Sequence, residues 1–561
     1  MLRPCHITLL LLCLLPNFIH AQVTLGQEQA NNTSACTADS LHPYCSSAFT
    51  AVTDAHDSGN SQPIETTVFD PVPGHVSSVS LSSTAQPTLM YQGFNGKFLC
   101  EYQPWFSQQS GNNAHWNVGY DETNLQTTNA QASAMINVGC NVALVDFYGT
   151  NELDKASYQF NLNATGTLFT SVSNVSANLK FGILEDDKAF NGTSSGTGDT
   201  GNCNQYGSAG NYNTQDEQDT IQCIETALQN DVTWTAQHYT SGGAYWIDGR
   251  SHKPVITFFG SLCDFPAIYY QDTQPCPQAS GQGISNWNQI WTYIQNWSNT
   301  TFPPGIAYVF QYGAFGRPAI QSPTGDFAWP QPAPWDGNDG TDSTGSQFWW
   351  CDGAMYQCSP YGYLYRFYQN ASQDMSQHQG DIGIGVIEKG FDGTLINWGN
   401  NRVTSQQCGN VLLLTAAEPS TSGYFSKNNQ IPYMQIATWN DYEEGTEIET
   451  GIDNCYSIPQ PVINEQNGTI NWTLNSSDLY GYASHSTIHH FTIWWGKHNS
   501  GPNDPIYVAA TNIGNGQTSF LLSNLSNLPH PAPDYTIDLF VEMVGMPLIL
   551  NKMLPAVSYT Y

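Results

Sequence analysis

Two acidic side chains at the end of one apolar run are the residues best suited to chemistry. The stretch 435–449 is QIATWNDYEEGTEIE, in which Asp441 and Glu444 stand three residues apart. Hydrolysis of a glycosidic bond needs one carboxylic acid to protonate the leaving oxygen and a second carboxylate as base or nucleophile. Crowded carboxylates raise one another's pKa, so that one stays protonated while the other is ionised. The pair predicts glycoside hydrolysis, with a solvated acidic turn as the alternative.

Short apolar runs predict the strands that would position this pair. Segments of helical character, such as 217–230 and 287–297, separate the runs, which lie at 98–102, 142–147, 181–184, 255–259, 306–310, 382–387 and 434–439. Alternating strands and helices of this kind predict a (β/α)8 TIM barrel, an α/β fold whose reactive residues follow the strand ends. Polar or aromatic residues do follow several runs, namely Glu101, Tyr102, Asp146, Tyr148, Glu185, Asp186, Gln311, Tyr312, Glu388, Asn440 and Asp441.

The chain changes character after Cys455. Short β-rich segments separated by Pro, Gly, Asn and Ser predict a β-sandwich of fibronectin type III or immunoglobulin-like kind. We expect it to stabilise the barrel, with polysaccharide binding as the alternative role. The predicted domains are a signal peptide, an extended lead-in, the barrel and the β-sandwich accessory domain, at 1–21, 22–86, 87–454 and 455–561.

The N-terminus and the cysteines predict export. Arg3 precedes an apolar run at 7–15 that is too short for a membrane span and is typical of a signal peptide. Many N-x-[ST] sequons indicate N-glycosylation. An even number of cysteines outside the signal predicts disulfides, and short spacings favour Cys36–Cys45, Cys203–Cys223, Cys263–Cys276 and Cys351–Cys358. We expect a secreted protein of the extracellular space or cell wall.

The amino-acid composition limits the classes of molecule that the chain is expected to bind. A formal charge of −32 repels nucleic acid, anionic membranes and acidic polysaccharides. The 16 Trp and 30 Tyr residues offer rings on which the apolar faces of sugars stack. The sequence contains no zinc-protease, P-loop or dinucleotide-binding motif. We therefore expect a monomer that binds a neutral polysaccharide or oligosaccharide without a cofactor or metal.

Several motifs, in order along 89–449, together resemble a known group of hydrolases. They are Tyr102 to Trp105 (YQPW), His115 to Tyr120 (HWNVGY), Asp146 to Gly149 (DFYG), Glu185-Asp186, Tyr245 to Arg250 (YWIDGR), Gly390 to Asp392 and the W-N-D-x-x-E motif that begins at Trp439. This set resembles glycoside hydrolase family 71 (α-1,3-glucanase, or mutanase) and the related family 99 (endo-α-mannosidase).

The resemblance implies roles for particular residues. Glu444 would be the general acid and Asp441 the base, and the sugar would be bound by Tyr102, Trp105, His115, Trp116, Asp146, Tyr148, Glu185, Trp439 and Asn440. The short acid at position 441 is similar to the α-1,3-glucanases, whereas the segment 444–449 is similar to the mannosidases. An α-1,3-glucan hydrolase is the first expectation. An endo-α-mannosidase-like enzyme and a non-catalytic carbohydrate-binding wall protein are the alternatives.

Overall fold

The structure is a computed structural model. The residues that it describes are 94–107, 120–150, 155–175, 178–186, 203–206, 211–240, 243–260, 265–272, 282–311, 324–329, 361–378, 380–392, 403–404, 406–421, 423–442, 444–449, 451–457, 461–476, 482–499, 506–529, 535–546, 548–549, 551–553 and 556–560.

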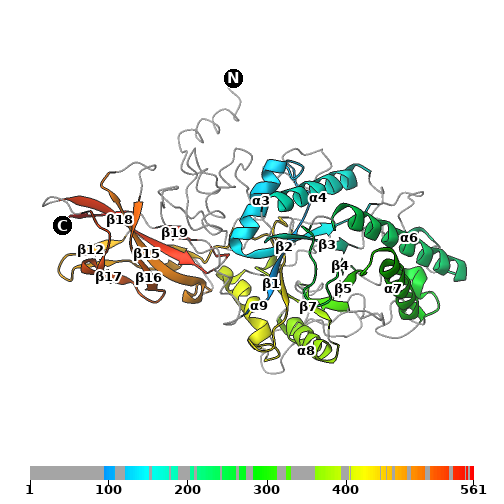
Figure 1. The fold of residues 1–561 in the computed structure, drawn as a ribbon. Helices are drawn as coiled ribbons and strands as arrows, with labels where there is room; N and C mark the ends of the chain where they lie inside the picture. The colour runs from blue at the N-terminus through cyan, green and yellow to red at the C-terminus, as the bar shows by residue number, and fades with distance from the viewer. Residues whose placement is uncertain are drawn as a thin grey trace, which may run out of the picture.

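Eight parallel strands close into a barrel, which confirms the predicted (β/α)8 fold (Figure 1). Around the barrel they follow the order β1-β10-β7-β6-β5-β4-β3-β2, so the first strand pairs with the last. Their bounds are β1 (Lys97–Tyr102), β2 (Cys140–Phe147), β3 (Lys180–Asp186), β4 (Val255–Phe259), β5 (Ala307–Gln311), β6 (Thr324–Phe327), β7 (Ile382–Ile387) and β10 (Tyr433–Ile436).

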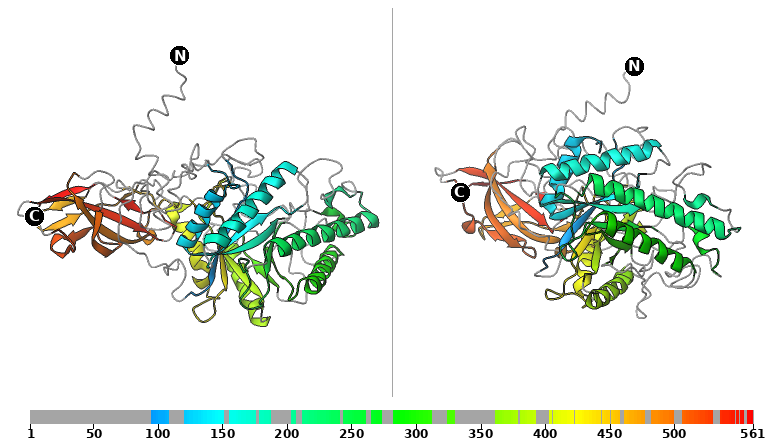
Figure 2. Two further views of the ribbon diagram at one scale, coloured as in Figure 1. Left: turned by 45° about the horizontal axis from the view of Figure 1, so that its top comes forward. Right: turned by 45° about the vertical axis from the view of Figure 1, so that its right-hand side comes forward.

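Helices cover the outside of the barrel (Figures 1 and 2). The two segments of predicted helical character lie inside α6 and α7, and Asn213 begins α6 with a capping box that includes Asp216. The helices are α3 (Leu125–Val138), α4 (Lys155–Val175), α6 (Thr214–His238), α7 (Gln282–Thr301), α8 (Tyr361–Gln377) and α9 (Asn410–Thr421).

Strand β6 is the one barrel strand that the apolar runs did not predict. Its sequence, TGDF, contains a single large apolar residue, Phe327, which fills the barrel interior. Gly325 passes so close to β7 that an added Cβ atom would lie 1.8 Å from the carbonyl oxygen of Ile382. The requirement for glycine removes the apolar pattern from which strands are predicted.

Alternate residues of each strand separate the interior of the barrel from its outer layer. Leu99, Leu144 and Leu184 belong to the interior cluster, which Trp246 also joins near the beginnings of the strands. The residues between them pack under the helices, as Cys100 does. Because this alternation continues to the strand ends, it decides which polar side chains face the barrel axis.

Three disulfides are described. Cys203–Cys223 confirms one predicted pair, whereas Cys100–Cys140 and Cys408–Cys455 join residues 40 and 47 positions apart. The sequence did not predict these two longer pairs, because short spacing between cysteines favours only local disulfides. The other predicted pairs, Cys36–Cys45, Cys263–Cys276 and Cys351–Cys358, lie outside the described residues. No helix in the described ranges is long and apolar enough to span a membrane.

The C-terminal region consists of antiparallel sheets, as its β-rich sequence predicted. A sheet of β12, β13 and β17 and a larger sheet of β15, β16, β18, β19 and β20 contribute to one apolar core that includes Trp472, Phe491 and Leu539. The bounds are β11 (Tyr456–Ser457), β12 (Val462–Asn464), β13 (Thr469–Asn471), β14 (Asn475–Ser476), β15 (Ile488–Lys497), β16 (Ile506–Gly514), β17 (Ser519–Leu521), β18 (Thr536–Gly545), β19 (Lys552–Met553) and β20 (Val557–Thr560).

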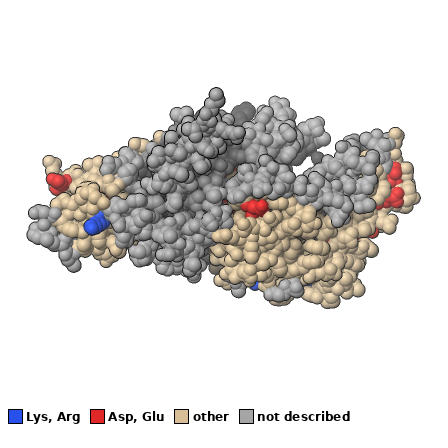
Figure 3. Space-filling view, turned by 90° about the horizontal axis from the view of Figure 1, so that it is seen from above, with Lys and Arg blue, Asp and Glu red and all other residues tan. Residues whose placement is uncertain are grey.

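The C-terminal region lies beside α9 at one side of the barrel (Figure 2). The backbone N–H of Ile452 donates to the carbonyl of Leu548, and the Asn410 carboxamide donates to the carbonyl of Tyr482. On the face shown in Figure 3, the described Asp and Glu side chains lie in small separate groups. The acidic excess therefore forms no single patch on the described part of that face.

Candidate active site

Five acidic side chains lie at the ends of four neighbouring strands. Glu101, Asp146 and Asp186 belong to β1, β2 and β3, and Asp441 and Glu444 follow β10. The first four side chains are at most 6% exposed, and Glu444 is half-buried. We call these five residues the carboxyl cluster.

The electrostatics show that these carboxyl groups are neighbours. Burial raises the pKa of Asp146 well above its ordinary value, and the charges of Asp186, Glu101, Asp441 and Glu444 raise it further, in that order. Like charges in a poorly solvated site disfavour simultaneous ionisation. The cluster therefore favours a mixture of protonated and ionised carboxyl groups, as acid and base catalysis requires.

Glu101 is held between two carboxamides. Gln435 Nε2 donates to one of its oxygens over 2.8 Å, and Gln103 Nε2 donates to the other over 3.0 Å. Burial raises the pKa of Glu101 well above its ordinary value, although these hydrogen bonds oppose the shift. Asp441 and Asp186 add repulsion that raises this pKa further.

The turn at 437–449, which we call the acidic loop, fixes the backbone of both candidate catalytic residues. Asp441 N donates to Thr438 Oγ1 over 2.9 Å, and Glu444 N donates to Asp441 Oδ1 over 3.0 Å. The carbonyl of Asp441 accepts from Thr446 N over 3.1 Å. Asp441 is therefore oriented through its side chain as well as its backbone.

Asn440 connects the acidic loop to the segment after β1. Its Oδ1 accepts from Gln103 N over 2.8 Å, while its Nδ2 donates to Gln103 O and to Glu122 Oε1 over 3.0 and 2.7 Å. Glu122 in turn accepts from Phe106 N. Asn440 is fully buried, so the structure places this expected sugar-binding residue in a positioning role.

Tyr102 and Glu185 project away from the barrel axis. Tyr102 lies between β1 and α3, where its hydroxyl donates to Gln131 over 2.8 Å. Burial, followed by the charge of Asp231 on α6, raises the pKa of Glu185 well above its ordinary value. The structure therefore does not bring these two expected sugar-binding residues into the carboxyl cluster. Asp186, one residue after Glu185, is the inward-facing acid of β3.

Besides Tyr102, three of the expected sugar-binding aromatic residues are described. The Trp105 and Tyr148 rings lie 5.3 Å apart after β1 and β2, and Tyr148 is partly exposed. Trp439 is 1% exposed within the outer core and is not available as an open platform. His115 and Trp116 lie outside the described residues. Trp105 is also buried, so Tyr148, whose ring packs against Trp105, is the described aromatic side chain that suits a sugar ring.

A second layer of hydrogen bonds supports the acidic loop. Glu449 Oε2 accepts from Tyr120 and Tyr442 over 2.9 and 2.8 Å, and its Oε1 accepts from Gln131 over 3.2 Å. Burial raises the pKa of Glu449 to about 7, against these three hydrogen bonds. This layer was not predicted from the sequence, because nothing in the pattern distinguishes Glu449 from the other acids of the stretch.

Two further buried acids lie near the end of β7 and in the acidic loop. Glu388 is 3% exposed, and burial raises its pKa to about 7. Glu447 forms an ion pair with Lys389, and both side chains are completely buried. No group of three or more His, Cys, Asp or Glu side chains in the described part of the chain is arranged to hold a metal ion.

No protein-family model matches the chain, and no curated protein sequence matches it. Among solved structures, it is similar to the GH99 endo-α-mannosidase from Bacteroides thetaiotaomicron, with 12% identity and a TM-score of 0.37 over 63% of this chain and 87% of that chain. A glycoside hydrolase-like protein has 9% identity and a TM-score of 0.38 over 65% and 89% of the two chains. A β-glucuronidase from Bacteroides uniformis has 8% identity and a TM-score of 0.34 over 84% and 46%. At these scores, the fold assignment depends on the closed barrel itself.

Proposed function

We propose that the chain is a glycoside hydrolase that cleaves α-glycosidic bonds. The observation that supports this proposal most directly is that Asp441 and Glu444 belong, with three buried acids, to the carboxyl cluster at the strand ends of a closed barrel. The strand ends of this fold are where reactive residues gather. Two carboxyl groups in different environments are the minimum that glycosidic hydrolysis requires.

The roles follow from exposure and hydrogen bonding. Glu444 is the more exposed acid, so it can reach the leaving oxygen and exchange protons with solvent. Asp441 is 5% exposed, and its Oδ1 accepts from the N–H of Glu444, which holds the carboxyl group in a fixed orientation. We assign Glu444 as general acid and Asp441 as the base that activates water, which predicts an inverted product.

We propose a neutral polysaccharide as substrate, with α-1,3-glucan as the first linkage to test. An endo-α-mannosidase-like activity is the alternative that the acidic loop also suits. We further propose that the chain is secreted, with a catalytic region at 87–454 and an accessory β-sandwich at 455–561. The three disulfides support an oxidising compartment.

Release of reducing sugar from α-1,3-glucan, α-1,4-glucan and yeast mannan tests this function. One polymer should be cleaved, and Glu444→Gln and Asp441→Asn should each lower turnover by roughly a thousandfold, within the range of positioned acids and bases. Glu465→Gln, which removes an exposed carboxylate in the C-terminal region, is the matched control. Near-normal turnover in either active-site variant would contradict the assignment, and binding without product release would indicate the carbohydrate-binding alternative.

A further inference from the structure

Buried acceptor atoms without a donor among the described residues lie in the carboxyl cluster and on the two carboxamides that hold Glu101. Asp146 is only 6% exposed, and its Oδ1 has no hydrogen-bond partner among the described residues. Gln103 and Gln435 use their Nε2 atoms on Glu101, and their Oε1 atoms are also buried without a partner in the described part of the chain. A buried acceptor without a donor is costly, so these atoms point to a ligand that donates hydrogen bonds.

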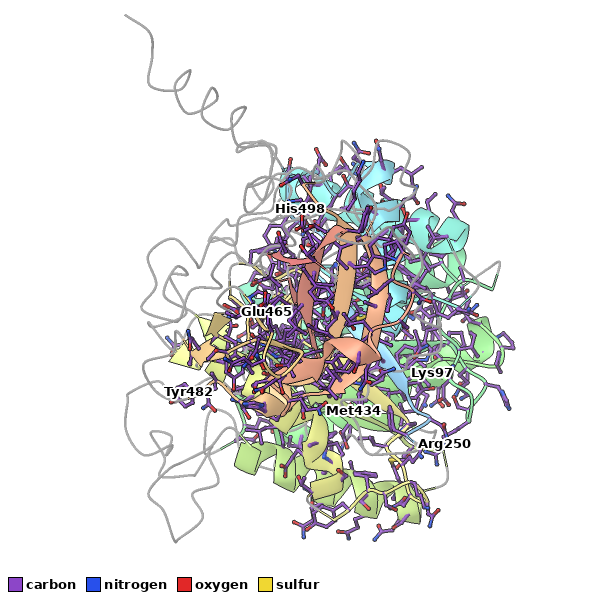
Figure 4. The ribbon with its side chains drawn as sticks, turned by 90° about the vertical axis from the view of Figure 1, so that its left-hand side faces the viewer. Lys97, Arg250, Met434, Glu465, Tyr482 and His498 are labelled. Carbon is purple, nitrogen blue, oxygen red and sulfur yellow. A yellow bond between two sulfur atoms is a disulfide. The ribbon has the colours of Figure 1, made fainter. Side chains whose placement is uncertain are left out.

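Four of the described cationic side chains of the barrel lie at its other end. The described side chains Lys97, Lys180, Arg250 and Lys253 belong to segments at the beginnings of strands, and Figure 4 shows Lys97 and Arg250 on the same side. Lys389, after β7, is already paired with the fully buried Glu447. None of these cations is hydrogen-bonded or ion-paired to Asp146 or Glu101 in the described structure.

We infer that the sugar unit held by Glu101, Asp146, Gln103 and Gln435 carries a protonated amine. This inference rests on the proposed α-glycoside hydrolysis and goes beyond its neutral substrate, because it names the preferred α-linked unit as a hexosamine with a free amino group. An ammonium group donates three hydrogen bonds and accepts none, which suits the two carboxamide oxygens and an ionised Asp146, whereas a hydroxyl group also presents lone pairs. Its charge also compensates carboxylates in a weakly screened site.

Two further observations agree with a cationic unit. Burial and then mutual repulsion raise the pKa of Asp146 and of Glu101, and a bound cation would relieve that repulsion. The partly exposed Tyr148 ring, which packs against Trp105 after β2, offers aromatic surface for the apolar face of a sugar. Acetylation of the amine would remove its charge and two of its donors. The N-acetylated sugar should therefore bind more weakly than the sugar with a free amine.

Calorimetric titration of the full-length Glu444→Gln variant tests the inference without turnover. The probes are methyl α-glucosaminide, methyl α-glucoside and methyl N-acetyl-α-glucosaminide, which differ only at the 2-substituent. The amine should bind at least tenfold more tightly than either neutral probe. Adding Asp146→Asn should reduce this preference to less than threefold, whereas adding Glu465→Gln should leave it unchanged. Circular dichroism checks that the variants are folded. Gln435→Leu provides a second perturbation, which removes an acceptor and the donor to Glu101 without removing a charge.

The outcomes separate the inference from the proposed function. Equal or tighter binding of the glucoside overturns the inference, and cleavage of a neutral α-glucan by the wild type would then leave the proposed function standing. Amine-selective binding that depends on Asp146, with no cleavage of neutral or amine-bearing α-linked polymers, supports the cation site and overturns the hydrolase. Faster cleavage of a deacetylated α-linked hexosamine polymer than of the glucan supports both.

Discussion

Replacement of Glu449 by Gln should remove a measurable part of the pH dependence of stability. Glu449 is 3% exposed, and burial raises its pKa from an ordinary value of 4.5 to about 7. The folded chain therefore binds this proton more tightly than the unfolded chain. Protonation stabilises the fold as the pH falls from 7 towards 4.5, and this contribution is lost as the pH rises through 7.

The magnitude follows from the two pKa values. A tenfold change in proton affinity is about 1.4 kcal/mol, so the interval from 4.5 to about 7 corresponds to about 3 kcal/mol. Between pH 7.5 and pH 5.0, Glu449 should contribute about 2 kcal/mol to the free energy of unfolding. Gln does not titrate, so the pH dependence of the variant should be smaller by that amount.

The hydrogen-bond partners of Glu449 can also be satisfied by the carboxamide of a Gln side chain. In the Glu449→Gln variant, the carboxamide oxygen would replace the carboxylate oxygen that accepts from Tyr120 and Tyr442, and the carboxamide nitrogen would face Gln131. A turn of the Gln131 carboxamide would then present its oxygen to that nitrogen. The Tyr102 hydroxyl, which now donates to Gln131, would accept instead and donate to Glu122. The variant should therefore fold.

Urea unfolding at pH 5.0 and pH 7.5, followed by tryptophan fluorescence, measures the effect. Exposed Glu465→Gln removes the same charge and should retain the pH dependence of the wild type. Tighter proton binding by Glu449 in the folded chain would be contradicted if Glu449→Gln and the wild type showed the same difference in unfolding free energy between the two pH values.

Three other substitutions test the scaffold. Lys389→Met should destabilise the chain by about 3–5 kcal/mol because it leaves the buried Glu447 charge unpaired, and Lys389→Met with Glu447→Leu should recover most of that loss in the same urea assay. Cys408→Ser should cost about 4 kcal/mol of unfolding free energy, since the bond to Cys455 spans 47 positions; an unchanged melting temperature would contradict this. Gly325→Ala should prevent barrel closure because its Cβ would overlap a β7 carbonyl, and a normal yield of protein with native circular dichroism would exclude the clash.

The sequence predicted the barrel more fully than the orientation of its site residues. Apolar runs located seven strands, and β6 was missed because its close contact requires Gly325. On β3, Ile183 and Leu184 are both apolar, so the pattern does not reveal whether Glu185 or Asp186 faces the axis. The register with β2 and β4 decides it. Tyr102 was correctly predicted at the end of β1, but in the structure its side chain lies on the outer face of the barrel. The apolar pattern of β1 does not reveal this orientation either.

Hydrogen-bond partners far apart in the chain were also beyond prediction. Gln103 and Asn440 are 337 positions apart, yet they exchange two hydrogen bonds between the segment after β1 and the acidic loop. The sequence around each residue does not predict its hydrogen-bond partner. Only the pairing of β1 with β10 brings them together.

That pairing also has a consequence for the order in which the molecule becomes functional. The segment carrying Asp441 is attached to β1 through Trp439 N and the Glu101 carbonyl, so the site lies at the seam where the barrel closes. A nascent chain that ends before the acidic loop has the acids of β1, β2 and β3. It lacks Asp441 and Glu444, which complete the carboxyl cluster. Contacts of such long sequence separation form slowly, because the entropy of closing the intervening chain must first be overcome. Assembly of the site therefore coincides with closure, and an incomplete barrel is an inactive one.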